Sequence, residues 1–90
     1  MSKKGDMLHL ARAIGMVSRD IDMECRTLSG VSHPMDIPAA VYRAEKLFEH
    51  FLTLLNEATE CKFPAAMLRD TSDTAAMFRQ AIDRLKAEQR

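Results

Sequence analysis

The fold is decided by residues 37–61, which read IPAAVYRAEKLFEHFLTLLNEATEC. Apolar residues recur there every three or four positions, the interval that places side chains on one face of an α-helix. The main stripe and the residues beside it are Ile37, Ala40, Val41, Ala44, Leu47, Phe48, Phe51, Leu52, Leu54, Leu55 and Ala58. An apolar arc this wide is typical of a helix that is contacted from more than one direction. We therefore expect residues 37–61 to form the central helix of an all-α fold.

A second long helix is expected over residues 7–29. Its apolar residues follow a heptad-like spacing and comprise Met7, Leu10, Ile14, Val17, Ile21 and Leu28. Asp6 is placed to cap the N-terminus of this helix, and Gly30 is placed to end it as the C′ residue. Residues 32–36 have the composition of a turn, and Pro38 is tolerated in the first turn of the central helix.

A shorter third helix is expected over residues 73–88. Pro64 ends the central helix, residues 64–69 are consistent with a short helical turn, and Thr71–Asp73 offer side chains for a new N-cap. The predicted architecture is a single domain over residues 1–90. It is a long antiparallel αα-hairpin with a shorter C-terminal helix folded against it, which resembles a three-helix bundle.

Charge is balanced overall but unevenly distributed along the chain. The net charge of the 90 residues is zero, with an excess of basic side chains in residues 1–19 and 61–90 and of acidic side chains in residues 20–60. An acidic middle argues against a nucleic-acid binder, which normally presents a basic face. Charged residues interrupt every apolar stretch before it reaches the length of a membrane span or a secretion signal. We therefore expect a cytoplasmic protein with no membrane contact.

The two cysteines are expected to be free thiols. In a hairpin that turns near residue 33, Cys25 faces the region of Val41, and Cys61 lies about 30 Å further along the central helix at 1.5 Å per residue. A disulfide requires Cα atoms within about 7 Å. The cysteines also lack the spacing of a redox or catalytic motif.

No constellation in the sequence predicts a metal site, a cofactor site or a catalytic site. Glu45, Glu49 and His50 form the only local cluster that resembles a ligand set. Di-metal helical bundles use Glu-x-x-His, in which both ligands face the same way, whereas His50 points about 100° away from Glu49. We expect no catalytic residue, no metal and no cofactor, and therefore no enzyme.

The acids of the first helix have a structural explanation in the hairpin register. Asp20 is expected near Lys46, and Glu24 is expected near Arg43. Cross-helix ion pairs would account for these carboxylates without acid–base catalysis, although exposed pairs contribute at most about 1 kcal/mol each.

The first helix carries a second, weaker apolar stripe that predicts a partner interface at Ala13, Met16 and Met23. Met16 and Met23 are seven residues apart, so they share a helix face. Methionine is common where a surface must adapt to a partner. The alternative is that both methionines fill gaps in the core, and the spacing alone does not separate these two interpretations.

A dimer seam is predicted at Gly15, Leu47 and Leu54. Glycine in a helix costs about 1 kcal/mol relative to alanine, so close approach of another helix would explain Gly15. A third helix that starts at residue 73 is too short to cover Leu47 and Leu54. A second copy of the chain is the commonest cover for such surface, so we expect a homodimer.

These features favour a small non-enzymatic interaction protein that binds another protein. It would act as an inhibitor, adaptor or regulator, a class that includes small proteins of phages and mobile elements. Two alternatives stay open. A nucleic-acid-associated regulator would require the basic residues of the two chain ends to converge on one face, namely Lys3, Lys4, Arg12, Arg84, Lys86 and Arg90. A ligand- or metal-binding bundle would require Glu45, Glu49 or His50 to point into a pocket.

Overall fold

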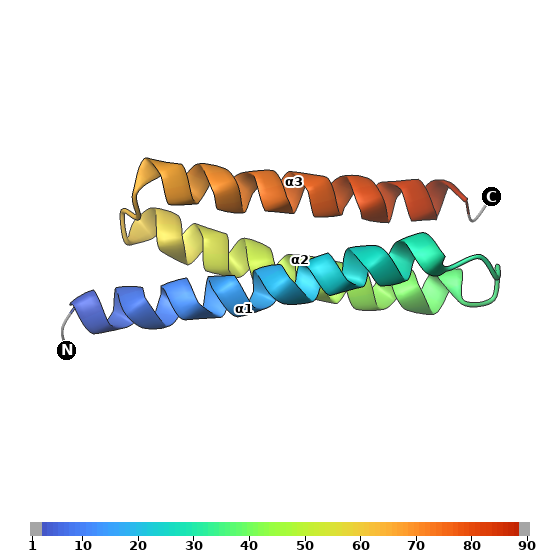
Figure 1. Cartoon of the computed structure of the whole chain (residues 1–90), viewed down its shortest axis with the longest axis horizontal. Helices are drawn as coiled ribbons and strands as arrows, with labels where there is room; N and C mark the ends of the chain where they lie inside the picture. Colours follow the sequence, from blue (N-terminus) through green and yellow to red (C-terminus); the bar gives the residue numbers. More distant parts are fainter. Residues whose placement is uncertain (1–2, 89–90) are drawn as a thin grey trace.

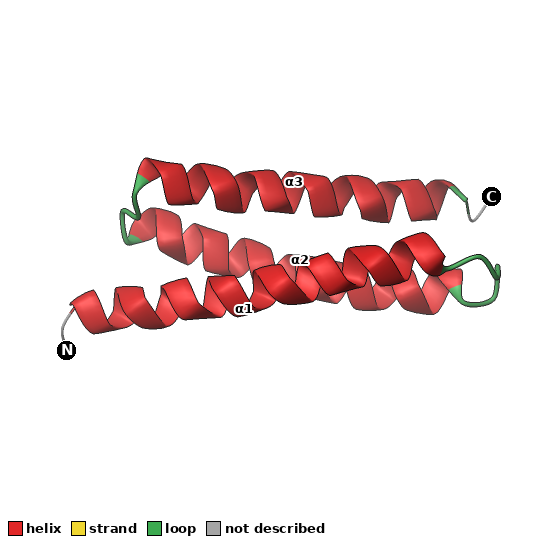
Figure 2. Ribbon diagram, viewed as in Figure 1, coloured by secondary structure: helices red, strands yellow, loops and turns green. Residues whose placement is uncertain are grey.

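The structure is all-helical, as predicted. The computed structural model describes residues 3–88, with side chains from residue 7 onward. It contains three helices, α1 (Lys3–Gly30), α2 (Ile37–Glu60) and α3 (Ala65–Ala87), joined by two short loops (Figure 2). No strand occurs in this part of the chain.

The three helices lie lengthwise in a rod of 48 × 20 × 16 Å (Figure 1). Successive helices are antiparallel, so α1 and α3 run in the same direction and the two loops lie at opposite ends of the rod. Each helix contacts both of the others, and α2 makes the most extensive contacts. The predicted central position of α2 is therefore confirmed.

Helix α3 begins much earlier than predicted. It runs without interruption from Ala65, whereas the sequence indicated a break before Asp73. The Thr71 hydroxyl does not cap a new helix, because it donates a hydrogen bond back to the Met67 carbonyl at 2.8 Å. Thr71 is buried against the bundle, and Pro64 precedes the first helical residue, where a proline is tolerated. The prediction of a short third helix is wrong, and α3, with 23 residues, is nearly as long as α2, with 24.

Helix α1 is also longer than predicted at its N-terminus. The helical backbone starts at Lys3, so Asp6 lies within the first turns and is not the N-cap residue. The C-terminal prediction is close, although Gly30 belongs to the helix and lacks the positive φ of a left-handed C′ glycine. In the loop that follows, the Met35 amide donates to Nδ1 of His33 at 3.2 Å, a side-chain bond of the kind that the turn composition indicated.

Helix α2 matches its predicted range within one residue. Pro38 lies in its first turn, as expected. At its C-terminus the Phe63 amide donates to the Ala58 carbonyl and the Lys62 amide donates to the Thr59 carbonyl, both at 3.1 Å. This pair of bonds is a Schellman motif, and it requires the left-handed conformation that Lys62 adopts at φ 58°. Phe63 is buried, so the motif also ties the end of α2 to the core.

The core consists of the inward faces of all three helices. Its largest fully buried side chains are Ile21 of α1, Phe51 of α2 and Phe78 of α3. Phe78 also packs edge-to-face on Phe48, with ring centroids 6.1 Å apart. Ala44 is completely buried, and its small side chain lets a neighbouring helix approach α2 closely.

Ion pairs join α2 to both of its neighbours. Nε of Arg43 lies 3.1 Å from Oε1 of Glu24, which confirms the register predicted for the hairpin. Nζ of Lys86 on α3 lies 3.1 Å from Oε2 of Glu45. Lys46 lies 4.0 Å from Glu49 on its own helix, and the ion pair expected between Lys46 and Asp20 is not formed. These pairs are partly exposed, so they fix the register more than they stabilise the fold.

The stability of the fold is expected to depend on Phe51. Phe51→Ala leaves a cavity between three helices and should lower the free energy of unfolding by about 3–5 kcal/mol. Leu52→Ala is the matched control, because Leu52 is 37% exposed, and it should change stability by less than about 0.5 kcal/mol. Urea unfolding followed by circular dichroism measures both. Equal losses in the two variants would contradict this description of the core.

Candidate functional site

The side of α1 that faces away from the bundle carries an ordered line of side chains. Arg12, Met16, Arg19, Met23 and Arg26 are spaced alternately by four and three residues, so they follow one face of the helix. All five are exposed. We call this line the outer face of α1, and it extends about 21 Å at 1.5 Å per residue.

The two methionines do not belong to the core. The exposed fraction is 68% for Met16 and 67% for Met23, even though both residues lie near the middle of a helix that packs on two others. Core filling was the alternative explanation for these residues, and it fails because the core is complete without them. Ala13, the third predicted interface residue, is half-buried and packs against the core instead.

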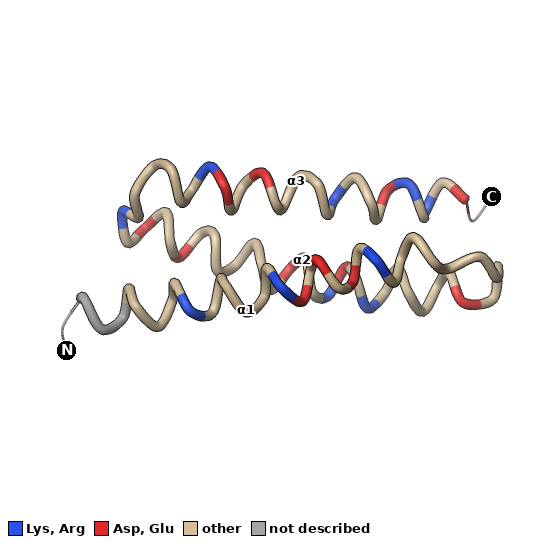
Figure 3. Tube along the Cα trace, in the orientation of Figure 1, with Lys and Arg blue, Asp and Glu red and all other residues tan. Residues whose placement is uncertain are grey.

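The three arginines interleave with the methionines and make no ion pair within the described part of the chain. Of the acids on the same helix, Glu24 pairs with Arg43 of α2, whereas Asp20 and Asp22 are exposed beside the line and make no ion pair among the described residues. Figure 3 shows the basic positions recurring along α1. The outer face is therefore both apolar and cationic.

Sequence reasoning singled out the methionines of this surface but missed the arginines. Their spacing was visible in the sequence, because Arg12, Arg19 and Arg26 recur every seven residues, the same interval as Met16 and Met23. A search for basic residues that share the period of an apolar stripe would have found them.

Gly15 lies beside the outer face, one turn after Ala11 and one turn before Arg19. A Cβ atom added to Gly15 meets no other atom within 4 Å, so nothing in the chain requires a glycine there. The predicted close approach of another helix does not occur within the single chain. The cost of a helical glycine, about 1 kcal/mol, is thus left unexplained by the bundle itself.

Leu47 and Leu54 are not the uncovered surface residues that the predicted dimer seam requires. Leu54 is buried in the single chain, and Leu47 is half-buried against the same core. Helix α3 begins at Ala65 rather than near residue 73, so it is longer than the seam prediction assumed. The reason for expecting a second copy of the chain on these residues is therefore removed. The homodimer itself stays a prediction.

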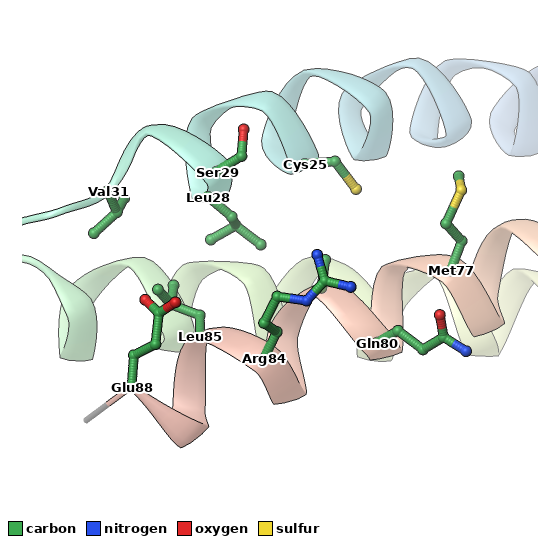
Figure 4. A pocket seen from close by; sticks show the side chains of 10 residues that line it. Cys25, Leu28, Ser29, Val31, Met77, Gln80, Arg84, Leu85 and Glu88 are labelled. Carbon is green, nitrogen blue, oxygen red and sulfur yellow. The ribbon is translucent and has the colours of Figure 1, made fainter. Parts of the chain in front are cut away.

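A cleft of about 460 Å³ lies between α1 and α3, where these two helices pack least closely. Figure 4 shows Cys25 on α1 and Met77 and Arg84 on α3 extending toward it. Its floor is apolar, and its rim carries Arg84 and Glu88, one charge of each sign. This cleft includes none of Glu45, Glu49 and His50, the residues considered as ligands.

The Cys25 thiol is not activated by its surroundings. Burial raises the pKa of this thiol, and the negative charges of Asp22 and Glu24 raise it further. The thiolate is the nucleophilic form of cysteine, so a raised pKa keeps Cys25 in its unreactive form at neutral pH. Cys61 is exposed, and both cysteines are free, as predicted.

Two further tests of function concern metals and membranes. Among the described residues, no three His, Cys, Asp or Glu side chains lie close enough together to hold a metal ion. No helix in the described part of the chain combines the length and the apolar character that a membrane span requires.

The basic residues proposed for a nucleic-acid face do not gather in one place. Because α1 and α3 run in the same direction, Arg12 lies in the first half of α1 whereas Arg84 lies in the last turn of α3, toward the opposite end of the rod. The side chains of Lys3 and Lys4, and all of Arg90, lie outside the described residues.

Comparison with known proteins found no family model, no curated protein and no solved structure that matches the chain.

The two cysteines are expected to differ in reactivity. At pH near 7.5, a thiol reagent such as iodoacetamide should modify Cys61 several times faster than Cys25, because Cys25 is partly buried and its pKa is raised. The rate for Cys25 should increase only at a pH above the range of an ordinary cysteine. The single variants Cys25→Ser and Cys61→Ser isolate each thiol for mass spectrometry. Faster modification of Cys25 at neutral pH would reveal an activated nucleophile instead.

Proposed function

We propose that this chain is a non-enzymatic interaction module that binds another protein through the outer face of α1. The observation that carries the proposal is the exposure of Met16 and Met23, at about two thirds of their surface, one above the other on the same face of α1. An exposed line of apolar side chains along one helix is typical of a surface that a partner covers. Acting by occupancy, such a module serves as an inhibitor, adaptor or regulator.

The chemistry of the outer face supports a protein partner. Methionine side chains are flexible and polarisable, so they adapt to the contours of another protein. Arginine is enriched at protein interfaces because its planar guanidinium combines an apolar surface with several hydrogen-bond donors. Gly15 exposes backbone beside these residues, which allows a partner to approach α1 closely.

A homodimer through Leu47 and Leu54 has less support than a separate partner. Both residues are covered by their own chain, so a dimer there would require part of the bundle to open. By contrast, the outer face of α1 is accessible in the folded monomer. We therefore assign the interaction to α1.

Replacing both methionines by glutamate should abolish partner binding and leave the fold intact. Met16→Glu with Met23→Glu places two charges in the contact, while the core, to which neither residue contributes, is unchanged. The control is Met35→Glu with Met77→Glu, two exposed methionines outside the outer face. Each tagged protein is purified from its source cells after nuclease treatment, and co-eluting proteins are quantified by mass spectrometry.

The expected result is a partner that the wild type and the control variant retain and the outer-face variant loses, with unchanged thermal unfolding in all three. Equal retention by the outer-face variant would remove the function from this surface. A substantial loss of thermal stability in that variant would instead place Met16 and Met23 in the core.

A further inference from the structure

We infer that the partner of the outer face of α1 is an acidic amphipathic helix. This inference rests on the proposed function and specifies the chemistry of the partner. It follows from the order of side chains along the face, from the sign of the charge, and from the positions that a second copy of the same face would occupy.

The order of side chains matches the seam of a helix pair. Arg12, Met16, Arg19, Met23 and Arg26 alternate by four and three residues, the a/d spacing with which two helices pack along their length. The face is about 21 Å long and flanked by the bare backbone of Gly15. A helix of about two heptads has the matching length, and one of about three heptads covers the whole face; its apolar residues would contact the two methionines.

The charge of the face specifies carboxylates on the partner. The three arginines make no ion pair with the described residues, so their guanidinium groups are free to form paired hydrogen bonds with incoming carboxylates. An uncharged or basic partner helix would place no carboxylate near the three arginines. The arginines would then lose water at the interface without gaining an opposite charge, so such partners are disfavoured. Asp and Glu residues beside the apolar stripe of the partner would provide that compensation.

A second copy of the same face is a poor occupant. In a two-fold antiparallel pairing about the middle of the face, Arg19 meets Arg19 of the other copy, and Arg12 meets Arg26. In a parallel pairing, each arginine meets its own counterpart. Both arrangements oppose like charges along the seam, and like charges brought together at an interface are unfavourable.

Nucleic acid and membrane surfaces fit the face less well than an acidic helix. Phosphate backbones recruit arginine but offer little to the intervening methionines, and the acidic residues of α2 oppose a polyanion. A membrane-surface helix has a wide apolar face opposite its basic residues. In α1 the basic and apolar residues share one narrow line, and the opposite face is buried in the bundle.

The probe for a direct test is a fluorescent synthetic peptide of about three heptads with Leu at positions a and d and Glu at positions e and g. One control peptide has Lys in place of Glu, and another has Ser in place of Leu. Fluorescence anisotropy with the full chain gives each dissociation constant at low and at moderate salt. The Glu peptide should bind at least about tenfold more tightly than either control, and salt should weaken its binding.

Charge reversal on the protein should reverse this preference. Arg12→Glu with Arg19→Glu is expected to bind the Lys peptide more tightly than the Glu peptide. The matched control is Arg69→Glu with Arg84→Glu, which changes the net charge equally on exposed arginines of α3 and should keep the preference of the wild type. Circular dichroism confirms that each variant is folded.

Several outcomes would overturn the inference. They are failure to bind the Glu peptide, equal binding of the Glu and Lys peptides, and equal binding of the Leu and Ser peptides. Tighter binding to phosphatidylserine vesicles or to duplex DNA than to the Glu peptide, lost in the Arg12→Glu, Arg19→Glu variant, would assign the face to a membrane or to nucleic acid. A mass that increases with concentration and decreases in this variant would assign it to a second copy.

The cell-derived partner separates failure of this inference from failure of the proposed function. A partner that is lost with Met16→Glu and Met23→Glu but retained with Arg12→Glu and Arg19→Glu would preserve the proposed function and exclude an acidic partner. A partner retained by both double variants would exclude the outer face of α1 altogether.

Discussion

The rest of the structure depends on the burial of α2 between α1 and α3. Phe51 and Ala44 are completely inaccessible, and together they place the inward faces of all three helices around one core. A chain of 90 residues buries only about two thirds of the surface that its unfolded form exposes, so it has little apolar surface to spare. Helix α2 is contacted on two sides, and its wide apolar arc provides the surface on which both α1 and α3 pack.

The two outer helices, α1 and α3, differ from α2 in how much of their surface the core covers. Each outer helix needs only one apolar stripe for the core, and for α1 that stripe runs through Leu10, Ile14, Val17 and Ile21. An apolar residue on the opposite side of such a helix therefore does not contribute to the core. Met16 and Met23 lie there, and their exposure has no explanation in the stability of the single chain. Our proposal therefore places folding and binding on opposite faces of the same helix.

The central helix and the hairpin register could be predicted because both follow from periodicity, as the contact between Glu24 and Arg43 confirms. The start of α3 could not be predicted, because the local sequence favours a helix that begins near residue 73. Thr71 and Asp73 are good N-cap residues, but burial of Thr71 and its bond to the Met67 carbonyl keep the chain helical. Tertiary packing overrode local propensity, and α3 became a single helix from Ala65 to Ala87.

The candidate site was only partly predictable for a related reason. Periodicity identified the stronger stripe of α1 as its core face, but it did not show whether the weaker methionine stripe is covered by another helix of the bundle. The answer depends on where α2 and α3 lie, and only the three-dimensional arrangement supplies that information. Once Leu10 and Ile14 are assigned to the core, geometry requires Met16 and Met23 to face outward. Arg12, Arg19 and Arg26 lie on the same line as the methionines, so a chain with no net charge still presents a line of basic side chains on one helix.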